Sequence, residues 1–264
     1  QDENGEFRAM ADDSKGIGNL ALKDEDKWIL AKVNDAVSEA TANMEKFDLS
    51  LAAQRAYELI WNEYCDWYIE LVKGRLYGDD EEDKKVARYV LVRALKDMLK
   101  LLHPFMPFIT EEIWSFLPQN KPSKDNPDNF LIKESWPTYE KALTFEEEVK
   151  KLELAMEAIR AIRNIRAEAE ATPSKKLSAV ILSSGRELES IKGGERYIRS
   201  LANITEIQFI NDKTQVPEEV MSAVIGNVEI YIPLDDLLDY KAEYDRLQKE
   251  KARLSGEVER VRGK

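Results

Sequence analysis

The sequence is poor in the two residues that most often build reactive centres, because Cys65 is its only cysteine and His103 its only histidine. A single cysteine excludes a disulfide within the chain and favours a reducing, cytoplasmic setting. One histidine and one cysteine cannot supply the four ligands of a Cys/His zinc site or the two histidines of a di-metal carboxylate site. A nucleophilic triad would have to use His103, which precedes Pro104 at an expected helix end. We therefore expect no catalytic residue and no metal site in this chain.

Long apolar runs are also missing. A typical run, Ala179 to Leu182, is far shorter than the roughly 20 residues of a membrane span. Residues 1–11 are polar and mixed in charge, unlike a secretory signal, so we expect no membrane partner. With 264 residues, 43% of them hydrophobic and 34% charged, the chain has a globular composition and the length of one large or two modest domains. Its first residue is Gln1 rather than methionine, which suggests a processed chain or an excised piece.

The chain has no overall positive charge, since its formal net charge is −12. This value argues against a nucleic-acid binder, whose affinity comes largely from lysine and arginine on phosphates. The charges are unevenly distributed, however. Residues 160–176 hold five basic and two acidic side chains, and residues 241–264 hold eight basic and five acidic ones. The sequence therefore predicts local basic surfaces on an acidic protein.

The first two thirds of the chain have the pattern of a helical bundle. Residues 1–23 show no periodicity and contain three glycines, which indicates a flexible lead-in. From Asp24 onward, apolar residues recur every three or four positions, as on the buried face of a helix. The expected helices lie near residues 24–44, 50–73, 91–102, 107–117 and 145–171. Residues 118–140 read as a loop. We assign residues 24–172 to an up-and-down helical bundle.

The pattern changes after residue 172. Strands are expected at residues 177–182 and 204–210, a short helix at 190–202, and a hairpin around Gly226 and Asn227. We assign residues 173–235 to a small α+β unit. The last segment, residues 236–264, carries a heptad seam made of Tyr240, Tyr244, Leu247, Lys251, Leu254, Val258 and Val261. The predicted fold is therefore mainly α: a helical bundle, a small α+β unit, and the first helix of a truncated coiled-coil arm.

Several motifs resemble those of one enzyme family. Residues 101–114, LLHPFMPFITEEIW, resemble the helix-bundle domain of class I aminoacyl-tRNA synthetases for aliphatic amino acids. More specific strings are similar to the bacterial valyl branch of that family. They are DKWIL at 26–30, DLS at 48–50, AYELIWNEYCDWYIE at 56–70, IRAIRNIRAE at 159–168 and PSKK at 173–176. The heptad tail resembles the first strand of the C-terminal arm of that family. The resemblance runs from about Asp24 to the end of the chain.

The resemblance implies that this region recognises the anticodon stem-loop of the tRNA for valine, while the arm contacts the body of the tRNA. The adenylation signatures of the class, His-Ile-Gly-His and Lys-Met-Ser-Lys-Ser, are absent from the sequence. The editing domain and the first bundle helix of the family are also missing. We therefore expect a C-terminal fragment that is inactive alone and holds no cofactor. ATP, Mg²⁺ and valine would belong to the catalytic domain, which with the editing domain would be a partner in the parent chain.

The expected helix 145–171 carries the first set of candidate tRNA contacts. Its apolar stripe of Leu152, Ala155, Met156 and Ile159 continues at helical spacing into arginines. On the functional interpretation, this set binds tRNA phosphates through Arg160, Arg163, Arg166, Lys175 and Lys176. On the structural alternative, the arginines pair with bundle carboxylates such as Asp66 or Glu70 and stabilise the helix C-terminus.

The second set lies near the end of the expected second helix. Its aromatic residues could stack on unpaired bases or fill the bundle core. We expect Trp61 and Tyr64 in the core and leave both roles open for Trp67 and Tyr68. Because the resemblance implies that this helix end lies close to the anticodon loop, we add Ile69, Lys73 and Arg75 as candidate contacts.

A different class of function stays open at this point. The chain could be a helical scaffold or protein-interaction module that dimerises through the heptad seam. The net charge of −12 and the lack of a returning helix favour this alternative. We expect a monomer, with self-association through the arm as the alternative.

Overall fold

The structure is a computed structural model that describes residues 17–117, 129–172, 174–237, 248, 251–255 and 258. The chain forms two compact units, residues 1–150 and 151–264. The division lies inside one long helix, whereas the sequence pattern had suggested a boundary at residue 172. Of the heptad seam, only Lys251, Leu254 and Val258 are described, and all three are exposed. The other seam residues and most of the expected lead-in lie outside the described residues.

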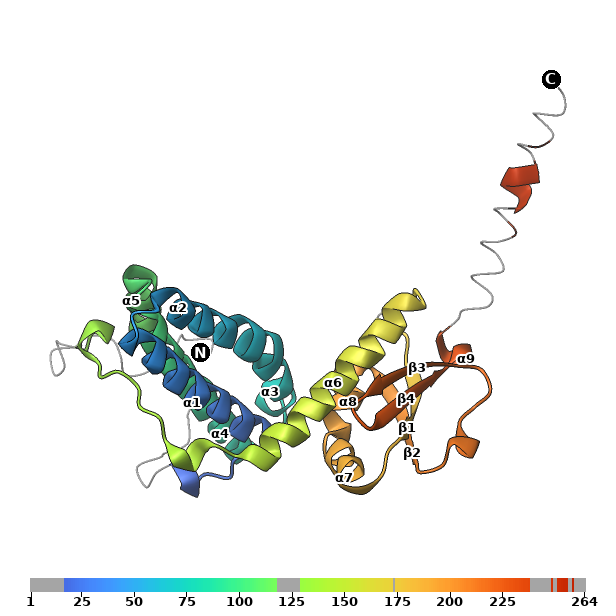
Figure 1. Cartoon of the computed structure of the whole chain (residues 1–264), viewed down its shortest axis with the longest axis horizontal. Coiled ribbons are helices and arrows are strands. Elements are labelled where there is room, and N and C mark those ends of the chain that lie inside the picture. The colour runs from blue at the N-terminus through green and yellow to red at the C-terminus, as the bar shows by residue number, and fades with distance from the viewer. Residues whose placement is uncertain are drawn as a thin grey trace. The chain divides into compact units, whose positions relative to one another are not determined.

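The first unit is a bundle of antiparallel helices, coloured blue to green in Figure 1. The long helix α1 lies against both α2 and α4. A short 3₁₀ turn, η1, precedes α1, and two others, η3 and η4, follow α5. The elements are η1 (Ile17–Asn19), α1 (Asp24–Glu45), α2 (Leu49–Glu58), η2 (Leu59–Tyr68), α3 (Ile69–Leu76), α4 (Glu81–Leu102), α5 (Pro107–Ser115), η3 (Leu131–Lys133) and η4 (Lys141–Leu143).

Local sequence signals explain where these helices begin and end. The Asp80 side chain caps α4 by accepting hydrogen bonds of 3.1 Å from the backbone N–H groups of Glu82 and Asp83. The same helix ends at Leu102, just before the His103-Pro104 pair, as predicted. His103 itself keeps helical angles (φ −53°, ψ −41°), so the helix ends because Pro104 has no N–H to continue the hydrogen-bond ladder. Pro107 opens α5 at a first-turn position, where its missing N–H costs nothing. The sequence therefore predicted the end of α4 and the start of α5 correctly, whereas α4 begins at Glu81, well before the expected residue 91.

The second expected helix differs from the prediction in its middle. α2, η2 and α3 follow one another without a break, but the ten residues of η2 form a π-helix. The backbone N–H of Ile69 accordingly donates to the carbonyl of Tyr64, five residues back. The wider turn shifts the buried face by one residue. The buried positions run through Ala52, Ala56, Leu59, Tyr64, Tyr68 and Val72, with a step of five at the π segment.

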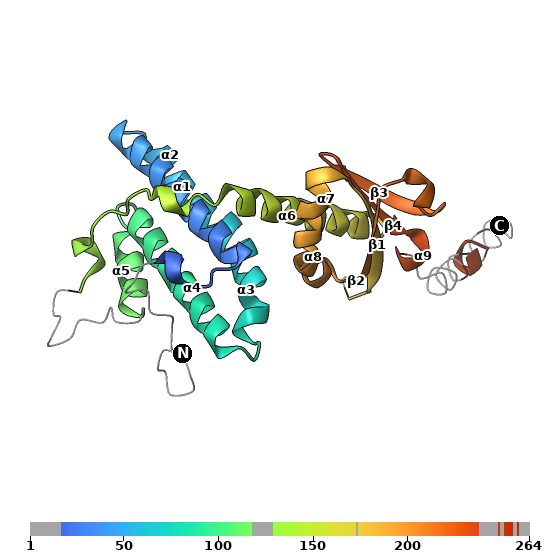
Figure 2. The same ribbon diagram turned by 90° about the horizontal axis from the view of Figure 1, so that it is seen from below.

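The second unit combines α6 (Glu146–Glu168) with a four-stranded sheet of order β2-β1-β4-β3. β1 is parallel to β2 and antiparallel to β4, and β3 and β4 form the predicted hairpin. Figures 1 and 2 show α7 and α8 in the connection between β1 and β2. The remaining elements are β1 (Leu177–Leu182), α7 (Gly185–Gly193), α8 (Glu195–Ala202), β2 (Ile204–Ile210), η5 (Lys213–Gln215), β3 (Val220–Ile225), β4 (Val228–Pro233) and α9 (Leu234–Leu237).

Glycine allows α6 and α8 to approach closely. A Cβ at Gly194 would lie 2.5 Å from the Cβ of Ala155, which no real side chain tolerates. The single helix expected at residues 190–202 is instead two helices, α7 and α8, which meet at Gly194. Ile162 and Ile165 of α6 are buried, as their spacing predicted.

Among the described residues, no helix combines the length and apolar character needed to cross a membrane.

Candidate functional site

The C-terminal half of α6 lies beside the end of α8, and its arginines divide into exposed and buried positions. Arg160 and Arg163 are exposed, whereas Arg166 is only 7% exposed. The guanidinium of Arg163 donates two hydrogen bonds, of 3.2 and 2.9 Å, to the carbonyl oxygen of Leu201. Arg166 donates to the carbonyl oxygen of Ala202 at 2.9 Å. Both arginines thus satisfy carbonyl groups at the C-terminus of α8, where cations are stabilising.

The burial of Arg166 corrects its prediction as a phosphate contact. Its remaining N–H groups donate to the carbonyl oxygens of Thr172 and Lys175, at 3.1 and 2.6 Å. Burial lowers the pKa of Arg166, but an arginine stays protonated in proteins. A charged guanidinium with several internal acceptors is committed to the fold. The partners of Arg166 are backbone carbonyl oxygens and not the carboxylates of Asp66 or Glu70 that the structural alternative named.

The basic loop after α6 is accessible. Lys176 is exposed and Lys175 half-buried, and both lie in this loop, the segment between Glu168 at the end of α6 and Leu177 at the start of β1. Together with Arg160 and Arg163, they make a set of four cationic side chains on the C-terminal half of α6 and in the loop that follows it. We call this set of four residues the basic corner. Glu168 and Glu170 are also exposed nearby, so the positive excess is small and local.

The second predicted set, at the end of α3, is mostly buried. Arg75 is 8% exposed, and its guanidinium contacts Glu25, Asp26 and Asp83 at 3.2, 2.7 and 2.7 Å. Burial alone would lower the pKa of Arg75, but the hydrogen bonds to Asp83 and Asp26 and the charges of Asp26 and Glu25 raise it above its usual value. The prediction of Arg75 as a tRNA contact is therefore wrong on structural grounds, because the side chain is an internal ion-pair partner.

Two aromatic candidates are also core residues. Tyr68 has no exposed surface, and its hydroxyl donates to the Asp26 carboxylate at 3.0 Å. The preceding residue, Trp67, is also buried. Neither ring is available for stacking on a base. Ile69 is half-buried. Lys73 is exposed and pairs at 2.5 Å with Glu70, one turn earlier. Of the five residues predicted at this helix end, only Ile69 and Lys73 keep accessible surface.

The sequence placed Trp61 in the core, and the structure corrects this. Trp61 is 52% exposed and Tyr57 is 59% exposed, with ring centroids 6.1 Å apart. Both rings lie off the buried face, which runs through Ala56, Leu59 and Tyr64 with its step of five in the π segment. Tyr64 is buried, as expected, and donates its hydroxyl to the carbonyl oxygen of Leu91. A uniform helical period could not have distinguished Trp61 from Tyr64.

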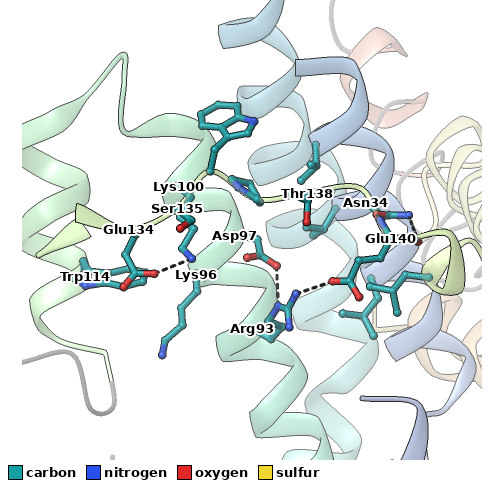
Figure 3. Close-up of a pocket in the computed structure, with 16 residues that line it drawn as sticks. Asn34, Arg93, Lys96, Asp97, Lys100, Trp114, Glu134, Ser135, Thr138 and Glu140 are labelled. Carbon is teal, nitrogen blue, oxygen red and sulfur yellow. Dashed lines mark hydrogen bonds and ion pairs between the residues drawn. The ribbon is translucent and has the colours of Figure 1, made fainter. Parts of the chain in front are cut away.

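A cavity of about 430 Å³ lies within the first unit, between α1, α4 and residues 134–140. Figure 3 shows Arg93 joined to two carboxylates and Lys100 to a third. Arg93 contacts Asp97 and Glu140 at 2.8 and 3.2 Å, and Lys100 contacts Glu134 at 2.8 Å. The three carboxylates balance the charges of Arg93, Lys96 and Lys100. Burial lowers the pKa of Lys96, whose ammonium lies 5.6 Å from the Trp114 ring centroid.

The polar contacts of this cavity tie an extended segment to the bundle. The side chain of Asn34 bonds both the backbone N–H and the carbonyl oxygen of Glu140, and the Trp136 indole N–H donates to Thr41. Paired charges of this kind stabilise the chain path and leave little net attraction for an anion. The cavity was missed by the sequence because residues 118–140 carry no periodic pattern. We do not place the functional site here.

Comparison with known proteins agrees with this architecture. Residues 26–181 match the family described as the anticodon-binding domain of tRNA ligase. The chain is 40% identical to the valine–tRNA ligase of Clostridium perfringens over 257 residues, which are 97% of this chain and 28% of that protein. It is 41% identical to the enzyme of Clostridium acetobutylicum over 96% of this chain, and 38% identical to that of Geobacter sulfurreducens over 94%.

The matched relatives are much longer than this chain, which spans 28% of the length of the first two. The family match covers more than half of the chain and includes the helical bundle, α6 and most of β1. The order of the motifs, from DKWIL at residue 26 to PSKK at residue 173, is consistent with this match. The chain therefore belongs to the family of anticodon-binding domains of tRNA ligases.

Proposed function

We propose that this chain is the tRNA-recognition part of a valine–tRNA ligase, the ATP-dependent enzyme that attaches valine to its tRNA. The observation that carries the proposal is the similarity to valine–tRNA ligases along 97% of the chain. The partner would be the tRNA for valine, bound through its anticodon stem-loop. We further propose a cytoplasmic location, in keeping with the single cysteine.

The basic corner supports a contact with the tRNA backbone. Arginine and lysine on phosphates supply most of the sequence-independent affinity for nucleic acids. Arg160 and Arg163 lie on the C-terminal half of α6. Lys175 and Lys176 lie in the loop that follows, on a chain whose formal net charge is −12. We propose these four side chains as phosphate contacts, and Ile69 and Lys73 as contacts at the end of α3. We do not propose the buried candidates as direct contacts; they are Arg75, Arg166, Trp67 and Tyr68.

The residues of this chain do not fit a site for ATP and Mg²⁺. The sequence holds neither of the two adenylation signatures of the class, and its single histidine precedes Pro104 at the end of α4. His103 instead forms a hydrogen bond of 2.7 Å with the Thr110 hydroxyl. We propose that the ligase chemistry takes place outside these residues and that this chain is inactive alone.

A filter-binding titration tests the proposal. The chain is titrated against a transcript of the tRNA for valine and against a non-cognate tRNA, each at two salt concentrations. We expect tighter binding to the tRNA for valine, with an affinity that falls as salt rises because phosphate contacts release counterions. Equal weak binding of both tRNAs would contradict anticodon recognition by this chain. A molar mass in light scattering that doubles with concentration, without tRNA binding, would favour the scaffold alternative.

A further inference from the structure

Two side chains hold the basic loop from the inside. Arg166 donates to the carbonyl oxygens of Thr172 and Lys175, at 3.1 and 2.6 Å. Asn203 donates from its amide nitrogen to the carbonyl oxygens of Ser174 and Lys175, at 3.1 and 3.3 Å. We call Arg166 and Asn203 the loop clamp. Between them they bind the three loop carbonyl groups at residues 172, 174 and 175, and Arg166 also binds that of Ala202.

Each member of the loop clamp is fixed by its own helix. Arg166 lies in the last turn of α6 and is 7% exposed. Asn203 follows the last residue of α8 with a φ of 55°, the left-handed conformation that asparagine adopts more readily than other side-chain-bearing residues. The backbone N–H of Leu177, at the start of β1, donates to the carbonyl oxygen of Asn203 at 3.3 Å. The loop is therefore held between two helix ends and the first residue of a strand.

The clamp binds backbone oxygens and leaves the lysine side chains of the loop accessible. Lys176 is exposed and Lys175 half-buried, although the carbonyl of Lys175 receives hydrogen bonds from both clamp residues. A loop ordered before binding does not have to be ordered by the ligand, which lowers the free-energy cost of association. The guanidinium of Arg166 is itself buried and donates to carbonyl oxygens inside the protein.

We propose that Arg166 and Asn203 are positioning residues for RNA binding, which hold Lys175 and Lys176 where these lysines contact phosphates. This inference rests on the proposed function and assigns to Arg166 an indirect role. It also assigns a role to Asn203, which carries no charge and which the sequence pattern did not single out. The ligand is the RNA sugar–phosphate backbone, recognised by charge and without readout of the base sequence.

The decisive variant is Asn203→Gly. Glycine adopts the required positive φ without strain, so the backbone of the α8 end is retained while both amide donors are removed. The charge of the protein is unchanged. We expect the affinity for the tRNA for valine to fall about threefold to tenfold. The slope of log affinity against log salt should fall by up to about one unit for each lysine that no longer reaches a phosphate. Arg166→Gln should have an effect of the same kind.

A double-mutant cycle separates positioning from a general structural effect. In a Lys175→Ala/Lys176→Ala background, Asn203→Gly should change the affinity less than about twofold, because its effect acts through the two lysines. Hydrogen exchange of the peptide covering residues 174–177 should be faster in Asn203→Gly than in the unaltered chain. Circular dichroism and thermal melting show whether each variant is folded at the binding temperature.

The outcomes that overturn the proposal are distinct. Unchanged affinity of Asn203→Gly, or an equal loss in the lysine-free background, would exclude positioning of the lysines. A strong effect of Arg166→Gln with none of Asn203→Gly would show a direct contact of Arg166 with RNA and would also overturn the proposal. Failure of the unaltered chain to bind RNA would instead overturn the proposed function, and the positioning role with it.

Discussion

The guanidinium of Arg75 lies 2.7 Å from a carboxylate oxygen of Asp26, and both side chains are buried where the end of α3 meets the start of α1. Tyr68 donates its hydroxyl to the other oxygen of the same carboxylate at 3.0 Å. Burial raises the pKa of Asp26, although the Arg75 charge acts in the opposite direction. α1, η2 and α3 thus meet in one polar cluster, which Asp83 joins from the first turn of α4.

Replacing Arg75 by methionine should strongly destabilise the first unit. The substitution leaves the carboxylates of Glu25 and Asp26 buried without their cation, and removal of one partner of a buried pair costs about 3–5 kcal/mol. Urea unfolding followed by circular dichroism measures the change. Lys73→Met is the matched control two residues earlier, where an exposed pair contributes little. Similar stability of the two variants would show that the cluster does not stabilise the fold.

The Asp83 carboxylate should contribute stability that is lost in acid. Burial acts to raise the pKa of Asp83, but hydrogen bonds from Arg75 and Lys23 and their charges lower it below the usual 3.8. A lowered pKa means that the folded protein favours the charged form. The contribution is therefore complete well above pH 3.8 and declines as the pH falls through the lower, folded-state value.

Comparison with Asp83→Asn isolates this effect. We expect the melting temperature of the unaltered chain to exceed that of the variant near neutral pH, and the difference to shrink at about pH 3. Asp26 shifts in the opposite direction, but it is present in both proteins and largely cancels in the comparison. A difference that stays constant across this range would contradict the assignment of the shift to Asp83.

Charge reversal at the basic corner should weaken RNA binding without unfolding the protein. Arg160→Glu and Lys176→Glu change exposed positions, where substitutions affect stability little. Removing one phosphate partner should reduce the salt slope by about one unit. Lys213→Glu is the control of equal charge change. Lys213 forms an ion pair with Glu229 of β4. Glu229 lies opposite Leu182 in the β1–β4 register, so Lys213 is near the end of β1 that is remote from Lys176. An equal loss in the control would indicate a nonspecific charge effect.

Two tryptophans of the π-helical segment should differ in their contribution to stability. Trp61→Ala removes a ring that is 52% exposed, so we expect a loss below about 1.5 kcal/mol. Trp67→Ala removes a buried ring and leaves a cavity, which typically costs about 3–5 kcal/mol. Chemical denaturation of both variants gives the two free energies of unfolding. Equal losses would mean that the surface of Trp61 is covered in solution.

The sequence alone determined the class of the fold and most element boundaries. Pro104 ended α4, Pro107 opened α5, and alternating apolar residues around Gly226 and Asn227 gave the β3–β4 hairpin. These features depend on residues within a few positions of one another, so they are readable from the chain. The basic cluster between residues 160 and 176 was visible for the same reason.

Only the tertiary structure decided which of the candidate residues are accessible. A π-helical turn put Trp61 outside the core and Trp67 inside it, because one extra residue in a turn rotates every later side chain. Arg75 and Arg166 look like surface cations in sequence. Each is buried because acceptors from distant segments surround it: carboxylates from α1 and from the first turn of α4 for Arg75, and carbonyls of α8 and the basic loop for Arg166. The burial of these side chains depends on tertiary contacts with those partners, which a local sequence pattern does not predict.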